Sequence, residues 1–302
     1  MKKILLSIAI ITGMSSCSQD DNGEMAVQEF PNGTNYTISN VDSQNAYAQL
    51  KQNLQANGAI GIVAEVDHQQ NAQSIGENLD YTKIIFFGNP NLGTPLMQKN
   101  QLAGLDLPQK ILFYKDEGRN IILYNSVEYL SSRHDLNGVG TLDQISGALE
   151  NLATGVSNEE VLTAENRTVD FKEGIITKQS TQNFNETYAR LKNALNTNEN
   201  ISIIAELDHQ ANAASVDMDL RPTRIIIFGN PNLGTPLMQS EQTTGLDLPQ
   251  KMLVWENGDG EVFISYNDPD FIAERHNIDD AQETLNTIGM ALDNLSNAAA
   301  GN

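Results

Sequence analysis

The sequence predicts an α+β protein of two tandem β-α-β4-α units, each an antiparallel sheet covered by helices on one face, a two-layer sandwich. The main observation is an uninterrupted twelve-residue string, FGNPNLGTPLMQ, which occurs at Phe87–Gln98 and again, 141 positions later, at Phe228–Gln239. The second observation is that the same order of strand and helix signals runs through both copies. We therefore interpret the chain as a duplication, in which each candidate functional residue has a counterpart.

Each copy is predicted to begin with a short strand and an amphipathic helix. The strand signals are at Tyr36–Ser39 and Gly174–Lys178. Apolar residues then recur at helical spacing, which predicts a helix with one buried face. These residues are Tyr47, Leu50 and Leu54 in the first copy and Phe184, Tyr188, Leu191 and Leu195 in the second.

Four strands and two closing helices are predicted next. In the second copy the strands are Ile201–Leu207, Arg224–Phe228, Lys251–Trp255 and Glu261–Tyr266. The turn residues Asn257–Gly260 predict a hairpin between the last two strands. Asp268 and Pro269 are cap and first-turn signals for a short helix. The final helix is indicated by Leu142, Ile145, Leu149 and Leu152 in the first copy and by Leu285, Ile288, Leu292 and Leu295 in the second.

The two copies are predicted to occupy residues 34–154 and 174–298, and the polar residues 155–173 between them are interpreted as a linker, some of which can pack against the copies. With 39% hydrophobic residues, the chain can supply two ordinary domain cores. The sequence leaves open whether the copies are separate or share a pseudo-twofold interface. If they pair internally, no oligomer is required.

The N-terminus resembles a bacterial lipoprotein signal. Two lysines precede the apolar run Ile4–Gly13, which is too short to span a bilayer. Residues 1–16 are therefore predicted to be a signal peptide, and Cys17, the only cysteine, the lipidated first residue of the mature protein. The alternative is an ordinary signal peptide followed by an incidental cysteine. Residues 17–33 are predicted to be an acidic, disordered tether. The signal and the lipidated cysteine predict a protein of the bacterial cell envelope, lipid-anchored at the outer membrane or cell surface.

Charge and missing motifs restrict the classes of function. The formal net charge of -21 repels nucleic acid and anionic lipid headgroups. We therefore expect no nucleic-acid partner and contact with a membrane only through the lipid anchor. The sequence contains no G-x-S-x-G, H-E-x-x-H, C-x-x-C, Walker or dinucleotide-binding motif in a suitable context, so the cofactor stays unknown. Because the single cysteine belongs to the signal, haem attachment and thiol chemistry are excluded.

Several motifs occur in a fixed order in the second copy. They are Glu206–Ala214, Leu220–Arg224, Phe228–Pro231, Gly234–Met238, Leu246–Lys251, Trp255, Tyr266–Pro269 and Glu274–His276. In this order they closely resemble the family called domain of unknown function 302, and the first copy resembles a more divergent member. The resemblance implies a two-layer α/β fold and no established activity.

The first copy departs from this pattern at two places. Asp80–Lys83 replace Arg221–Arg224, and Tyr114 replaces Trp255. Any site that needs the groups of the second copy is therefore expected to be intact only there.

Two Asp-His pairs, Asp67-His68 and Asp208-His209, are candidate ligand-binding residues. Each pair lies where a predicted strand ends and a loop begins. An aspartate beside a histidine can orient the imidazole, raise its basicity or share a cation with it. The structural alternative is that Asp208 caps the following turn and His209 hydrogen-bonds a backbone carbonyl. Arg224 either pairs with Asp208 or holds an anionic ligand.

The repeated string supplies the other candidate ligand-binding residues, Asn89 and Thr94 in the first copy and Asn230 and Thr235 in the second. Its glycines are typical of a loop that holds phosphate. However, it contains no basic residue, and a proline removes one backbone donor, which argues against phosphate. The structural alternative is that Thr235 caps a helix whose first residue is Pro236.

Three functions are compatible with these features. The first is a binding module for a small ligand or divalent cation, with a cleft near Asp208, His209 and Gly229–Pro236 and no assigned metal-ligand set. The second is an enzyme of unidentified class, in which His209 is the general base and Asp208 orients it. The third is a structural or adhesive surface protein, in which the repeats set spacing and contacts.

Overall fold

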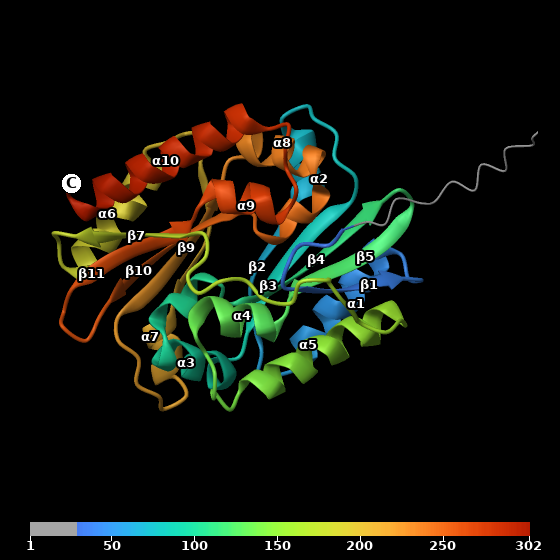
Figure 1. The fold of residues 1–302 in the computed structure, drawn as a ribbon, viewed down its shortest axis with the longest axis horizontal. Helices are drawn as coiled ribbons and strands as arrows, with labels where there is room; N and C mark the ends of the chain where they lie inside the picture. Colours follow the sequence, from blue (N-terminus) through green and yellow to red (C-terminus); the bar gives the residue numbers. More distant parts are fainter. Residues whose placement is uncertain (1–28) are drawn as a thin grey trace, which may run out of the picture.

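The computed structural model describes residues 29–302 and contains two antiparallel sheets with helices around them (Figure 1). The predicted α+β class with two tandem units is confirmed. The predicted signal peptide and Cys17 lie outside the described residues, as does most of the predicted tether. Within residues 29–302, no helix is both long enough and apolar enough to cross a membrane.

The first copy forms a six-stranded sheet in the order β2-β3-β4-β5-β1-β6. Its elements are β1 (Thr34–Ser39), α1 (Ser43–Ala56), β2 (Gly61–Asp67), α2 (His68–Ser74), β3 (Thr82–Gly88), α3 (Pro90–Lys99), the 3-10 helix η1 (Gln101–Leu105), β4 (Gln109–Asp116), β5 (Arg119–Asn125), α4 (Val127–His134), α5 (Leu142–Ser157) and β6 (Leu162–Thr163).

The second copy forms a five-stranded sheet in the order β7-β11-β10-β9-β8. Its elements are β7 (Ile175–Ser180), α6 (Phe184–Asn196), β8 (Ser202–Asp208), α7 (His209–Ala214), β9 (Thr223–Gly229), α8 (Pro231–Ser240), the 3-10 helix η2 (Gln242–Leu246), β10 (Gln250–Glu256), β11 (Val262–Asn267), α9 (Pro269–Arg275) and α10 (Gln282–Ala300).

Two short helices differ from the expectation of loops, and part of the predicted linker is packed. The short helices α2 and α7 begin at His68 and His209, where the sequence analysis expects loops. Both are too polar to show an apolar stripe, so periodicity gives no signal for them. Of the predicted linker, residues 155–157 complete α5, and β6 pairs with β1. This segment is therefore packed along part of its length.

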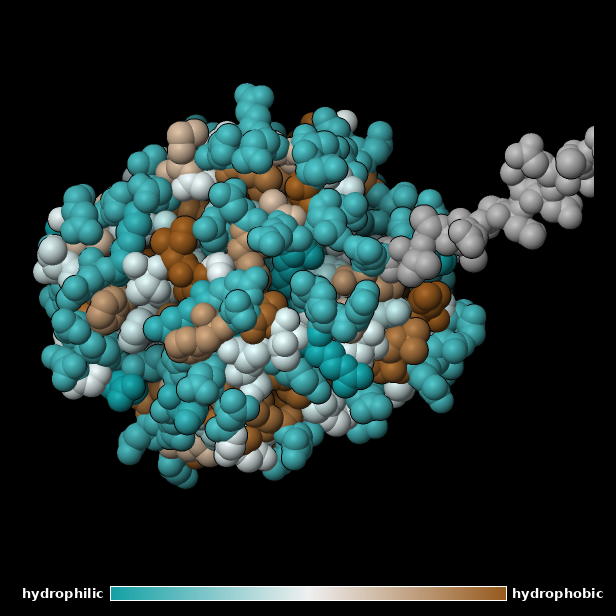
Figure 2. Space-filling model, in the orientation of Figure 1, coloured by the Kyte–Doolittle hydropathy of each residue, from teal (hydrophilic) through white to brown (hydrophobic). Residues whose placement is uncertain are grey.

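The long helices cover one face of each sheet. Helices α1 and α5 pack together over the first sheet, and α6 and α10 pack together over the second. The apolar stripes predicted for these helices are buried there, including Leu50 and Leu149 in the first core and Leu191 and Leu292 in the second. Figure 2 shows that the face turned toward the viewer is mostly hydrophilic, with separate hydrophobic patches between the polar side chains.

The opposite faces of the sheets form the interface between the copies. The 3-10 helix η1 of the first copy lies against β9, β10 and β11, and η2 of the second copy lies against β3, β4 and β5. A Cβ at Gly104 of η1 would be 3.0 Å from Leu253 Cδ1, and a Cβ at Gly245 of η2 would be 3.1 Å from Leu112 Cδ1. Only glycine fits such an approach without a shift of its neighbours. The copies therefore share a tight pseudo-twofold interface.

Candidate functional site

A cavity of about 570 Å³ lies between the two copies, at the place where α2 of the first copy packs against α8 of the second. Figure 1 places these two helices side by side. The cavity combines Asp67 and His68 of the first copy with Asn230 and Thr235 of the second. Its size is typical of a site for a small molecule.

This arrangement corrects the expected partners of the repeated string. The sequence analysis expects Asp208 and His209 to share a cleft with the string of their own copy, Gly229–Pro236. In the structure, the first copy supplies the Asp-His pair beside that string. Asp208 and His209 instead adjoin the first copy, because α7 packs against α3. The exchange follows from the reciprocal packing of the copies, which local sequence patterns do not report.

Both aspartates cap helices. The Asp67 carboxylate accepts a hydrogen bond from Gln70 N at 2.9 Å, and the Asp208 carboxylate accepts one from Ala211 N at the same distance. Asp208 also pairs with Arg224, whose Nε lies 2.6 Å from Oδ2. The structure thus contains the cap and ion pair that the sequence analysis gives as the structural alternatives.

Both histidines of the Asp-His pairs are buried against the opposite copy. His68 is 4% exposed and hydrogen-bonds the backbone of Gly245, while His209 is 3% exposed and hydrogen-bonds the backbone of Gly104. Burial lowers the pKa of each imidazole to about 4, so both are neutral at pH 7. In both rings Nε2 has no hydrogen-bond partner. We therefore assign the backbone bond to Nδ1–H as donor, a tautomer in which Nε2 is an acceptor.

The residues of the repeated string divide into caps and buried side chains. Asn89 and Asn230 are the N-caps of α3 and α8, each accepting a hydrogen bond at 3.0 Å from the amide two residues on. Thr94 and Thr235 lie inside these helices, fully buried, with unpaired hydroxyl groups. The expected cap at Thr235 is therefore wrong. Asn230-Pro231 and Thr235-Pro236 both fit the pattern of a capping residue followed by proline. In the structure Asn230 is the cap and Pro231 lies in the first turn of the helix.

Three residues of the cavity lining carry a buried polar atom without a hydrogen-bond partner. These atoms are His68 Nε2, Thr235 Oγ1 and Gln250 Nε2. Sequence reasoning did not select Gln250. Its signal was present, because glutamine follows the Leu-Asp-Leu-Pro motif in both copies, as Gln109 and Gln250. Buried polar groups are almost always paired, so three unpaired atoms on the lining of one cavity require an explanation.

The rest of the cavity wall is mainly apolar. Side chains that contribute to it are Ile204, Phe228, Met238, Leu248, Ile288 and Leu292. The charged residues of the lining already have partners: Lys83 Nζ lies 3.5 Å from the Asp67 carboxylate, and Glu65 pairs with Lys51 at 2.7 Å. Among residues 29–302, no group of three or more His, Cys, Asp or Glu side chains is arranged to hold a metal ion.

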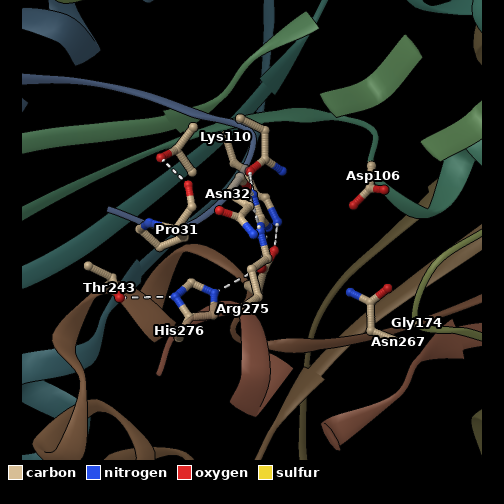
Figure 3. A network of polar contacts seen from close by, with 12 residues as sticks. Pro31, Asn32, Asp106, Lys110, Gly174, Thr243, Asn267, Arg275 and His276 are labelled. Atoms are coloured by element: carbon tan, nitrogen blue, oxygen red, sulfur yellow. Dashed lines mark hydrogen bonds and ion pairs between the residues drawn. The ribbon is translucent and has the colours of Figure 1, made fainter. Parts of the chain in front are cut away.

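A second polar feature, a buried ionic network, joins the copies (Figure 3). Asp247 accepts hydrogen bonds from Lys110 Nζ at 2.8 Å and Arg275 Nη1 at 2.5 Å, and its Oδ2 lies 3.0 Å from His276 Nε2. Arg275 also donates to the backbone carbonyl of Asn32. Lys110 belongs to the first copy and Asn32 to the end of the predicted tether just before it, so this carboxylate and this arginine bind the second copy to the first and to the segment that leads into it.

The first copy contains the matching carboxylate. Asp106 Oδ2 lies 2.8 Å from Arg133 Nη1 and 2.7 Å from His134 Nε2. Arg133 continues across the interface to Asn267 Oδ1 at 3.0 Å. The network therefore repeats the pseudo-twofold arrangement, with all of its ionised groups buried.

Comparison with known proteins gives relatives of two kinds. The chain is 41% identical over 105 residues to "Fluoride-specific ion channel FluC 1" of Brucella suis biovar 1 and to the protein of the same name from Brucella abortus biovar 1. The match covers 35% of this chain and 41% and 38% of those proteins, so the chain spans about two fifths of their length.

A solved structure, described as an uncharacterized conserved protein DUF302 from Bacillus stearothermophilus, is 20% identical with a TM-score of 0.39. It covers 42% of this chain and 98% of its own. The family description "Domain of unknown function DUF302" matches residues 35–152 and again residues 176–295. These two ranges make up more than half of the sequence, and the chain therefore belongs to the DUF302 family, with two tandem copies of its domain.

Proposed function

We propose that this protein is a binding module for a small neutral molecule that has one hydrogen-bonding end and an apolar body. The observation that carries the proposal is that three residues lining a mainly apolar cavity of about 570 Å³ have buried polar atoms without a partner, namely His68 Nε2, Thr235 Oγ1 and Gln250 Nε2. Nε2 of His68 accepts a hydrogen bond, the Gln250 amide donates, and the Thr235 hydroxyl does both. A primary amide or an alcohol matches this pattern.

The charge state of the lining argues for a neutral ligand. His68 is neutral at pH 7 because burial lowers its pKa to about 4, and Lys83 is paired with Asp67. An ionised ligand would lose its hydration in the cavity without gaining a partner of opposite charge, which is costly. The apolar wall formed by α8 and α10, by contrast, favours burial of a hydrocarbon body.

A comparison of three ligands of equal chain length tests this proposal. We expect octanamide to raise the melting temperature and to bind in calorimetry, because its amide can pair with all three polar groups. Octanoate and octylamine should leave the melting temperature unchanged. Fluoride, named in the curated relatives, is included among the charged ligands for which we expect no binding. Binding of a charged member in preference to octanamide would contradict the proposal.

A matched pair of variants locates the site. Thr235→Val keeps the shape of the side chain and removes the hydroxyl, so octanamide affinity should fall about tenfold, the effect of one lost hydrogen bond of about 1.4 kcal/mol. The control is Thr287→Val on α10, whose exposed hydroxyl bonds Glu283 O and does not face the cavity. Equal affinities of the two variants would place the ligand elsewhere.

We further propose that the mature protein is lipid-anchored at Cys17 in the bacterial cell envelope. The lysines, the short apolar run and the single cysteine of the N-terminus support this. In a bacterial host supplied with labelled palmitate, the natural chain should become labelled and sediment with membranes. Cys17→Ser should abolish both, and labelling that persists in this variant would exclude the anchor.

A further inference from the structure

Lys83 is the charged residue of the cavity lining that is held least closely. Its Nζ lies 3.5 Å from the Asp67 carboxylate, longer than the roughly 2.7–3.2 Å of an N–H···O hydrogen bond. The same Nζ lies 4.6 Å from the centroid of the Tyr47 ring. Glu65, by contrast, is bound at 2.7 Å by Lys51 and at 2.5 Å by the Tyr47 hydroxyl group. The N–H donors of Lys83 are therefore able to bind a molecule in the cavity.

The lining around Lys83 is open to solvent. The Lys83 side chain is 25% exposed, and this residue lines the cavity of about 570 Å³ together with Gln70 of α2 and Ser202 of β8. Gln70 and Ser202 are both exposed. A ligand can thus reach these polar side chains without a rearrangement of the fold.

The equivalent position of the second copy is arranged differently. Arg224 stands where the first copy has Lys83, and its Nε donates a hydrogen bond of 2.6 Å to the Asp208 carboxylate. Arg224 does not line the cavity. The looser ion pair, between Lys83 and Asp67, is therefore the one that lies at the cavity.

The two other polar residues at this place also differ from their counterparts. Ala211 stands at the position equivalent to Gln70, and Gly61 at the position equivalent to Ser202. Neither counterpart has a polar side chain, and neither lines the cavity. Side chains that can hydrogen-bond are thus present where the cavity lies and replaced where it does not.

We propose that Lys83 determines specificity by donating a hydrogen bond to a second polar group of the ligand, a neutral oxygen such as that of a hydroxyl or an ether. This inference rests on the function proposed above and adds to it. The ligand class becomes a hydrocarbon chain with an amide or alcohol at one end and a neutral oxygen acceptor further along the chain.

The charges around Lys83 favour a neutral acceptor. Asp67 balances the charge of Lys83, and Glu65 also lines the cavity. A carboxylate on the ligand would meet the repulsion of both protein carboxylates, whereas a neutral oxygen would not. A hydrogen bond from a charged donor is also stronger than one between neutral groups.

Calorimetric titration with matched amides tests the proposal. Plain amides of six, eight and ten carbons are compared with the ω-hydroxy and ω-methoxy amides of the same chain lengths. We expect a length at which both substituted amides bind about tenfold more tightly than the plain amide, because the charged donor pairs with the added oxygen. The methoxy oxygen can only accept, so its gain assigns the role of donor to the protein.

A matched pair of variants assigns the donor to Lys83. Lys83→Met removes the ammonium group and keeps an unbranched side chain, so the gain of the substituted amides should disappear while the plain amide keeps its affinity. Arg224→Met, at the equivalent position outside the cavity, is the control and should change neither affinity. Circular dichroism checks the fold of both variants. Should Lys83→Met not fold, Lys83→Gln also removes the charge, and the same loss of the gain is expected.

The outcomes separate this inference from the proposed function. Plain amides that bind with no gain from an added oxygen overturn the role of Lys83 and leave the proposed function. A gain with the hydroxy but not the methoxy amide also overturns this role, because the ligand would then donate to a protein acceptor. A gain that survives Lys83→Met does the same. No binding of any amide overturns both proposals.

Discussion

Lys251 belongs to a buried group in which positive charges outnumber negative ones. Lys110, Lys251, Arg133 and Arg275 are at most 4% exposed, and the carboxylates among them are those of Asp106 and Asp247. Burial lowers the pKa of Lys251 to about 7, and the neighbouring Lys110 acts in the same direction. Burial alone would raise the pKa of Asp247, but the adjacent Lys110 and Arg275 hold it well below its usual value.

Replacement of Lys251 by methionine should therefore stabilise the protein at pH 7. The unfolded chain keeps the lysine proton up to its ordinary pKa of 10.5, while the folded chain releases it near 7. The lysine thus costs stability below pH 7, and that cost declines as the pH rises to 10.5. Lys251→Met should gain about 1–4 kcal/mol at pH 7 and lose this part of the pH dependence, measured by urea unfolding at pH 7 and 9.5.

Lys99→Met, at an exposed position, is the control and should change neither quantity. A Lys251→Met protein that is less stable than the parent at pH 7 would show that the lysine is needed as an ionic partner. The Lys251 ammonium group would then balance the charge of the Asp106 carboxylate, whose Oδ1 has no hydrogen-bond partner.

The two buried histidines at the interface predict sensitivity to acid. The pKa of His68 and His209 is about 4 in the folded chain and 6.5 ordinarily. Between these values the unfolded chain binds more protons, so stability falls as the pH drops from 6.5 to 4. Each ring contributes on the order of 3 kcal/mol to this loss. The double variant His68→Gln, His209→Gln should show a flatter thermal-unfolding profile between pH 4 and 7, and an unchanged slope would refute this assignment.

At the scale of elements, the exchanged 3-10 helices determine how closely the copies approach. Each places a glycine against the opposite sheet, and a Cβ at Gly245 would lie 3.1 Å from both Leu112 Cδ1 and Thr82 Cγ2. These neighbours belong to buried strands and cannot move freely. The helices η1 and η2 also supply the backbone groups that His209 and His68 bind. They therefore link the interface to the buried histidines of both Asp-His pairs.

Gly245→Ala should destabilise the protein by about 1–3 kcal/mol, because the added methyl group overpacks the interface. The matched control is Gly147→Ala in α5, where an added Cβ meets nothing within 4 Å. This control should be neutral or should gain up to about 1 kcal/mol from helix propensity. Chemical denaturation measures both, and equal stability of the two variants would show that the approach at η2 tolerates a side chain.

At the scale of the whole molecule, each copy needs the other to cover the inner face of its sheet. The inner face of the first sheet, with Ile84, Phe86 and Leu112, is buried in a cluster that includes Ile227 and Leu246 of the second copy. Separation of the copies would expose this cluster and leave the ionic network without half of its groups. We therefore expect the two copies to unfold as one cooperative unit.

Fragments 29–166 and 167–302, prepared separately, should not exist as folded monomers. We expect aggregation or self-association of each alone, because their inner faces are apolar. Mixed after denaturation, they should form a 1:1 complex with the circular dichroism of the intact protein. Light scattering after size exclusion checks the masses, and a stable folded monomer of either fragment would contradict the prediction.

The sequence predicted the features that depend on neighbouring residues. The helical stripe of Phe184, Tyr188 and Leu191 and the strands around it required only local periodicity. The composition of the cavity was not predictable in this way. His68 and Thr235, or Lys110 and Asp247, are brought together by packing between copies, and no single-sequence pattern encodes that pairing. The duplication identified the matching residues but not which copy each would face.

The reciprocal interface also affects how such a chain can vary. In an assembly of two identical subunits, every substitution would alter both equivalent sites at once. Here the two halves are encoded separately, so Lys83 and Arg224 occupy equivalent positions with different side chains. Because the two copies are covalently joined, a residue of one copy can change while its counterpart in the other copy is kept. A symmetric homodimer lacks this independence.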